Sequence, residues 1–120
     1  MNSVRGMVDL KGEEAKNFDE IVKTATKFAH ASNFQTLHMP ILEFASIFER
    51  LGVDSDIVGK EIYKFQDRGD KILALRPEFT AGIMRHAVQS NLNKGVLPAK
   101  FFSHGALFRY DRPQRKTKTI

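Results

Sequence analysis

Residues 61–82 read "EIYKFQDRGDKILALRPEFTAG", and this stretch decides the fold. Two apolar runs lie on either side of the polar "DRGD" at 67–70, and both have the spacing and the residue types of β-strands. A polar turn that contains glycine is typical of a β-hairpin. The stretch therefore predicts two antiparallel strands, followed by a helix that Thr80 is placed to cap.

Three further segments predict helices. Residues 80–95 carry apolar side chains at helical spacing, and residues 45–52 form a shorter helical pattern that Gly52 ends. Residues 13–34 begin with two glutamates, which suit the N-terminal end of a helix dipole. Apolar positions in this last segment follow the i, i+3, i+4, i+7 pattern, namely Phe18, Ile21, Val22, Ala25, Phe28 and Ala29.

Two more segments predict strands. "FQTLHMPILEF" at 34–44 reads as a strand that Pro40 breaks, because proline lacks the N–H that a ladder needs. "LPAKFFSHGALFRY" at 97–110 has two apolar runs around Gly105, which predict further antiparallel strands. Hairpins with flanking helices predict an α+β fold. A chain of this length fits one domain, residues 1–120.

Composition places the chain among soluble globular proteins. Hydrophobic residues make up 42% and charged residues 28%, which is ordinary for a packed domain. There is no cysteine, so disulfides and thiolate metal sites are excluded and a reducing compartment is compatible. No apolar stretch approaches the roughly 18 residues of a membrane helix. We expect a cytoplasmic protein that does not insert into membranes.

The positive charge is concentrated at the C-terminal end. The net charge is +5, and residues 109–120 hold five basic residues against Asp111, which gives +4 for that segment. Such an end attracts phosphates through counterion release. A solvated terminus explains the same pattern, so both interpretations stay open.

General catalytic motifs are absent from the sequence. It has no G-x-G-x-x-G, no phosphate-binding loop with Gly-Lys-Ser/Thr, no G-x-S-x-G and no H-E-x-x-H. Its four histidines lie too far apart along the chain for a local metal pair. We predict no metal site.

"ALRPEFTAG" at 74–82 is the first candidate binding segment. Arg76, Glu78 and Thr80 surround a proline where a strand ends. If the strand ran on, alternation would place Glu78 and Thr80 on one face, where a carboxylate and a hydroxyl accept hydrogen bonds from a ligand ammonium. The alternative is a surface ion pair between Arg76 and Glu78, with Thr80 as a helix cap.

"LFRYDRPQ" at 107–114 is the second candidate. Leu107 and Phe108 would anchor a strand from which Arg109 projects. A guanidinium is the side chain that best matches phosphate or carboxylate oxygens. Solvated surface charge is the alternative.

Four blocks of the sequence resemble, in order and in spacing, the bacterial histidyl-tRNA synthetases. They are "RGMVDL" at 5–10, "MPILE" at 39–43, "YKFQDRGDKILALRPEFTAG" at 63–82 and "KFFSHGALFRYDRPQ" at 100–114. The resemblance implies part of a class II aminoacyl-tRNA synthetase catalytic domain, an antiparallel sheet flanked by helices, from motif 1 to the start of motif 2. It also implies a homodimer that uses ATP and Mg²⁺.

The resemblance assigns roles to individual residues. Glu78 and Thr80 match the family residues that bind the α-amino group of histidine. Arg109 matches the motif 2 arginine that binds the α-phosphate of ATP and stabilises charge when the histidine carboxylate attacks it. The segment from the first helix through Pro40 resembles motif 1, which forms the dimer. The sequence departs from common family residues at Phe79, Ser103, Ala106 and Leu107.

Residues 115–120, "RKTKTI", differ from the Gly-Arg-x-Arg loop that the resemblance implies after Gln114. One permitted codon string for these residues, read one base later, encodes Gly-Arg-Gln-Arg-Gln and so restores that loop. We therefore expect an aberrant basic tail that a frameshift produced within motif 2. Without the family's later motifs we expect no histidyl-adenylate formation and no tight binding of ATP or Mg²⁺ by this chain alone.

Three functions remain open on the sequence. The first is a fragment of a histidine–tRNA ligase, whose family partners are histidine, ATP and tRNA, and which forms a homodimer or associates with a full-length synthetase. The second is a non-catalytic paralogue such as the regulatory subunit of ATP phosphoribosyltransferase. The third is a small module that binds tRNA or a synthetase. We favour the first.

Overall fold

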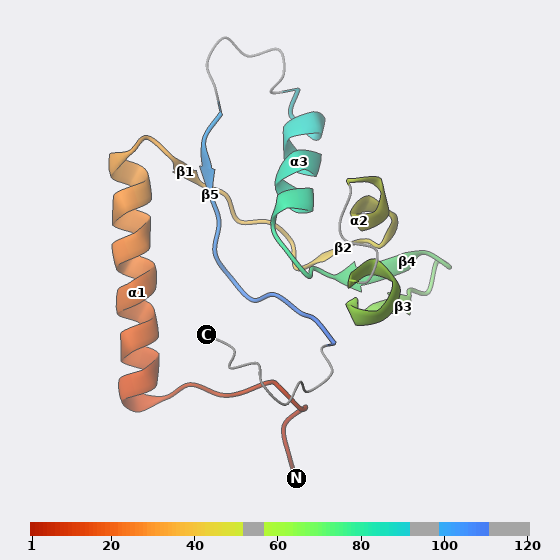
Figure 1. The fold of residues 1–120 in the computed structure, drawn as a ribbon, viewed down its shortest axis with the longest axis horizontal. Helices are drawn as coiled ribbons and strands as arrows, with labels where there is room; N and C mark the ends of the chain where they lie inside the picture. Colours follow the sequence, from red (N-terminus) through yellow and green to blue (C-terminus); the bar gives the residue numbers. More distant parts are fainter. Residues whose placement is uncertain (52–56, 92–98, 111–120) are drawn as a thin grey trace. The chain divides into compact units, whose positions relative to one another are not determined.

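The computed structural model describes residues 1–51, 57–91 and 99–110 (Figure 1). The chain divides into two compact units, Met1–Leu37 with Lys100–His104, and His38–Ala99 with Gly105–Ile120. Helices and a small antiparallel sheet confirm the predicted α+β class.

The first unit contains the long helix α1, Gly12–Ala31, which confirms the helix predicted there. Asn33 ends it in the left-handed conformation, with φ of 65°. Its N–H donates to the carbonyl of His30 at 3.1 Å, and the N–H of Phe34 donates to that of Ala29 at 2.9 Å. These two bonds satisfy carbonyls that the end of a helix would otherwise leave unpaired.

A short parallel ladder follows α1. Strand β1, Gln35–Thr36, pairs in parallel with β5, Phe101–Phe102. The antiparallel pairing predicted for residues 97–110 is therefore wrong for β5. More than 60 residues separate the two strands, and a long crossover connection lets a chain return in the same direction.

The second unit is built on a three-stranded antiparallel sheet. Its order is β2, Leu42–Phe44, then β4, Ile72–Leu75, then β3, Lys64–Gln66. The pairing of β3 with β4 confirms the predicted hairpin. The strand predicted across Pro40 is divided into β1 and β2, as the proline indicates.

Asp67 closes the hairpin loop. Its Oδ1 accepts hydrogen bonds from the N–H of Gly69 at 2.9 Å and of Lys71 at 2.8 Å. The left-handed position is taken by Asp70, with φ of 61°, although glycine stands beside it. Aspartate tolerates this conformation because its short polar side chain bonds locally, here to Gln66 Nε2 at 3.0 Å.

Helices α2, Ser46–Arg50, and α3, Thr80–Gln89, confirm the two helices predicted at these places. A π-helical turn, η1, spans Ile57–Glu61. The predicted stop at Gly52 and residues 92–95 of the predicted helix lie outside the described residues. No helix in the described ranges has the length and apolar character needed to cross a bilayer.

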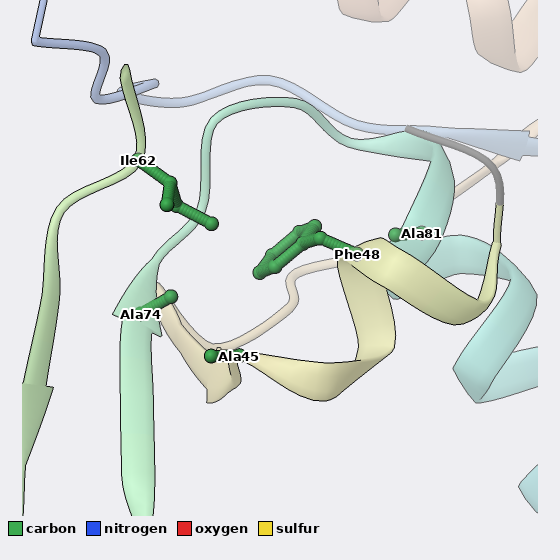
Figure 2. Packing of buried hydrophobic residues seen from close by; sticks show 5 residues of the cluster. All are labelled: Ala45, Phe48, Ile62, Ala74 and Ala81. Carbon is green, nitrogen blue, oxygen red and sulfur yellow. The ribbon is translucent and has the colours of Figure 1, made fainter. Parts of the chain in front are cut away.

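A small core holds the second unit together. Phe48 of α2 is fully buried and points toward Ile62 and Ala74, while Ala45 and Ala81 complete the cluster (Figure 2). Since Ala74 belongs to β4 and Ala81 to α3, this cluster fixes the start of α3 against the end of β4. The residues between these two points form the candidate site.

Candidate functional site

The candidate segment lies where the sheet gives way to a helix. Strand β4 ends at Leu75, Pro77 is fully buried, and α3 begins at Thr80. The strand does not run on, so the expectation that alternation places Glu78 and Thr80 on one face is wrong. A different contact brings these two residues together.

Glu78 caps α3 with its carboxylate. Its Oε2 accepts a hydrogen bond from the N–H of Thr80 at 2.5 Å, and its Oε1 accepts one from the N–H of Ala81 at 3.0 Å. The prediction that Thr80 caps the helix is therefore wrong, because Thr80 is already its first residue. The carboxylate satisfies helix N–H groups and benefits from the positive end of the helix dipole.

The carboxylate of Glu78 retains capacity for a ligand. Its two oxygens offer about four acceptor sites, and the helix N–H groups occupy only part of them. Glu78 is half-buried and the neighbouring Thr80 is exposed. The helix thus fixes the orientation of an anion beside an accessible hydroxyl, which is an arrangement that can bind an ammonium group.

Arg109 joins the same segment from a distant part of the chain. Its Nε donates to the carbonyl of Pro77 at 3.0 Å, directly before Glu78. The strand expected at Leu107 and Phe108 is wrong, because the structure assigns no strand to the described residues 103–110. Even so, the N–H of Phe108 donates to the carbonyl of Arg76 at 3.0 Å, and this bond aligns the two segments.

Arg76 is buried, and the alternative of a surface ion pair with Glu78 is wrong. Only 7% of Arg76 is exposed. Its Nε donates to the carbonyl of Ala106 at 2.9 Å, and its Nη1 donates to the carbonyl of Met39 at 3.1 Å. The residue therefore links three separate parts of the second unit.

A partly buried ion pair joins α3 to β2, and sequence reasoning missed it. Arg85 Nε lies 2.7 Å from Glu43 Oε2, and Arg85 Nη2 lies 2.8 Å from Glu43 Oε1. The partners come from α3 and β2, 42 residues apart. In the sequence, Glu43 and Arg85 are each a charged residue surrounded mainly by apolar ones. Charged residues in such surroundings are usually paired, so this pattern could have predicted the ion pair.

Packing around the segment leaves little space. A shallow hollow beside it is too small to admit a water molecule, and its lining comprises Met39, Pro40, Glu43, Phe48, Arg76, Glu78, Phe79 and Gly82. Gly82 permits this close packing, since a Cβ there would lie 2.9 Å from Met39 Sδ. A ligand at this segment would therefore lie over Glu78 and Thr80 rather than within the hollow.

Metal binding finds no support in the part of the chain that the structure describes. No group of three or more His, Cys, Asp or Glu side chains is gathered there in a way that could hold an ion. The contact with Pro77 brings Arg109 to the segment that also holds Glu78 and Thr80.

Comparisons with known proteins identify the family to which the chain is similar. A family model described as histidyl-tRNA synthetase matches residues 6–119. The chain is 44% identical over 116 residues to a histidine–tRNA ligase of Sulfurimonas denitrificans, and 45% identical over 115 residues to one of Orientia tsutsugamushi. These matches cover 96% and 95% of this chain but only 29% and 27% of the relatives.

Solved structures show the same likeness. The apo histidyl-tRNA synthetase of S. aureus superposes on 92% of this chain with a TM-score of 0.79 and 27% identity. A Bacillus halodurans C protein described as an ATP phosphoribosyltransferase regulatory subunit/histidyl-tRNA synthetase does so with a TM-score of 0.76 and 26% identity. The chain covers 30% and 28% of these structures. The chain therefore belongs to the histidyl-tRNA synthetase family.

Proposed function

We propose that this chain provides one side of the site at which a histidine–tRNA ligase activates histidine. Glu78 and Thr80 bind the α-amino group of histidine, and Arg109 binds the α-phosphate of ATP. The contact between Arg109 Nε and the Pro77 carbonyl carries the proposal. It attaches the side chain of Arg109 to the residue that precedes Glu78, which supports a single site that uses both groups.

The proposed chemistry assigns each group a distinct task. Glu78 accepts hydrogen bonds from the ammonium and leaves the carboxylate of histidine to attack the α-phosphorus, from which pyrophosphate departs. Arg109 stabilises the negative charge that develops on the phosphoryl oxygens. Mg²⁺ would enter with the phosphates of ATP, since it is commonly held through substrate phosphates and a few carboxylates.

Binding to this chain alone is expected to be weak. Thr80 and Arg109 are exposed, and the hollow that Glu78 helps to line has no room for a substrate group. We expect dissociation constants above about 1 mM, which corresponds to less than about 4 kcal/mol of binding free energy. We also expect no histidine-dependent exchange of pyrophosphate into ATP by the chain alone.

The histidine half of the proposal is tested by NMR titration with three ligands. Histidine and histidinol both carry the α-amino group, whereas imidazolepropionate lacks it. We expect the first two to shift the backbone amide signals of Thr80 and Ala81, and imidazolepropionate to leave them in place. Equal shifts with all three ligands would contradict recognition of the ammonium.

The proposed binding of ATP by Arg109 is tested through the NMR signal of the Arg109 side chain. Addition of ATP with Mg²⁺ should shift its Nε–H signal. The variant R109Q should abolish the response to ATP at neighbouring amides. Its matched control is R68Q, which removes the same charge from the exposed hairpin loop. If R68Q and R109Q weaken the response equally, the attraction is general electrostatics and the assignment to Arg109 is wrong.

The proposal extends to partners. Helix α1 has no buried residue, and Phe18, Ile21 and Phe28 on it are exposed. This apolar face would pair two copies of the chain or join it to a full-length synthetase, as expected for motif 1, with tRNA as the family's macromolecular substrate. A cytoplasmic location remains part of the proposal and rests on the family alone.

The likeness to the Bacillus halodurans C protein supports a second candidate function, that of a regulatory subunit. A regulator would change the activity of an ATP phosphoribosyltransferase catalytic subunit when the two are mixed. A ligase segment would not. We expect no change, and a reproducible change would favour the regulatory role.

A further inference from the structure

Arg76 is buried, and N–H groups of its guanidinium donate hydrogen bonds to main-chain carbonyls. Its guanidinium reaches Ala106 and Met39 at once, at 2.9 and 3.1 Å. The ring of Phe79 lies with its centroid 5.0 Å from the central guanidinium carbon. Burying a charge is costly unless its donors are satisfied, so an arginine in this place is maintained by the contacts that it makes.

The main chain of Arg76 joins the same neighbours. Its N–H donates to the carbonyl of Ile41 at 2.9 Å, and its carbonyl accepts from the N–H of Phe108 at 3.0 Å. Residues 106 and 108 are therefore attached to Arg76 through its side chain and its backbone respectively. The next residue along the chain is Arg109.

Gly105 shows how closely this segment approaches. A Cβ at Gly105 would overlap the Nη2 atom of Arg76, and its φ of 144° is a conformation that side chains with a Cβ rarely adopt. The bend at Gly105 and the guanidinium of Arg76 thus occupy adjoining space. A larger residue at position 105 would therefore displace the guanidinium of Arg76.

We infer that Arg76 is a positioning residue that holds Arg109 against the Glu78 segment. It fixes residues 106 and 108, and Arg109 then reaches the Pro77 carbonyl at 3.0 Å. The consequence for ATP rests on the proposed function, because it needs Arg109 to bind the α-phosphate. The positioning itself concerns only the protein.

Lysine cannot replace arginine in this role. A guanidinium presents several N–H donors in a fixed plane, so it can reach two carbonyls while it stacks on a ring. An ammonium has one donor centre and would reach one carbonyl or the other. R76K therefore keeps the charge but should release the segment that precedes Arg109.

The test follows the Nε–H of Arg109 by NMR in the intact chain, in R76K and in the control R85K. The control weakens another arginine of the same unit, the partly buried Arg85, which contacts Glu43 and Gln89. In R76K we expect solvent exchange of the Arg109 Nε–H to rise at least about tenfold, since the local opening that exposes it becomes easier. In R85K we expect no such change. An unchanged signal in R76K, or an equal rise in both variants, would overturn the inference.

A second variant covers the case in which R76K does not fold. G105A leaves Arg76 in the sequence and pushes against its guanidinium, so it should raise the exchange of the Arg109 Nε–H in the same way. An unchanged signal in G105A would also overturn the inference. A wild-type Arg109 that is protected but does not respond to ATP would defeat the proposed function and leave the positioning role in place.

Discussion

The carboxylate of Glu78 caps helix α3, and the same carboxylate is the one that we propose binds the ammonium of histidine. Its oxygens accept the N–H groups of Thr80 and Ala81, so the orientation of the anion is set by the helix that follows it. Loss of the side chain should therefore affect both stability and binding. A substitution that removes the charge but keeps the shape of the side chain should separate the effect on stability from the effect on binding.

We expect E78A to lower the free energy of unfolding by about 1 kcal/mol, as the loss of a helix cap usually does. E78Q keeps a carbonyl oxygen for the helix N–H groups and should retain most of this stability. Both variants should lose the response to histidinol, because the charge is gone. Urea unfolding and NMR titration measure the two effects, with E49A at an exposed glutamate as the control. An E78A chain as stable as E49A would contradict the capping role.

At the scale of elements, β2 and α3 are joined by the Glu43–Arg85 pair. The side chain of Glu43 is 7% exposed and that of Arg85 is 24% exposed. Removing one partner of such a pair leaves the other charge without its main compensation. Arg85 can partly turn to solvent and to Gln89, so the cost falls below that of a fully buried pair.

We expect E43A to lower the free energy of unfolding by about 2 kcal/mol. In the double variant E43A/R85A, the second substitution should add little, because the interaction is already lost. Urea unfolding of the two single variants and the double variant measures this coupling. Strictly additive changes would show that the pair contributes no coupling energy.

Local sequence patterns predicted most of the helices and the hairpin. They did not predict the strand pairing and side-chain contacts that depend on residues far apart in the sequence. The hairpin at Asp67 and helix α1 follow from alternation and helical periodicity within a few residues. The parallel pairing of β5 depends on the path of the whole chain. The contact from Arg109 to Pro77 and the burial of Arg76 also depend on that path. The family resemblance pointed to the candidate site residues, whereas the contacts of the Arg76 guanidinium became visible only in the structure.

At the scale of the whole molecule, many large apolar side chains of the described residues are exposed to solvent. Phe28 of α1 is 72% exposed, and the strand residues Leu42, Phe44 and Phe65 are exposed as well. Each large apolar side chain that leaves water contributes about 1.5–3 kcal/mol. The free energy therefore favours covering these surfaces with another protein surface.

We expect this chain to associate as its concentration rises, and we expect F28Q to weaken that association. The substitution lies on an exposed helix face, so it should leave the unfolding of the second unit unchanged. The control is K27Q, one position along the same helix. Sedimentation velocity over a concentration series measures the effect. A wild-type chain that stays monomeric throughout would contradict the role of this face.

If Glu78 and Arg109 belong to one site, both should contact histidinol adenylate, and the affinity for this ligand is the most direct measurement. This ligand carries the ammonium and the α-phosphate in one molecule, so binding at one group raises the effective concentration of the other. Its dissociation constant should be at least about tenfold below that of histidinol. E78Q and R109Q should each remove the gain, whereas R68Q should not. If histidinol adenylate binds no more tightly than histidinol, the two residues do not share a site and the account is wrong.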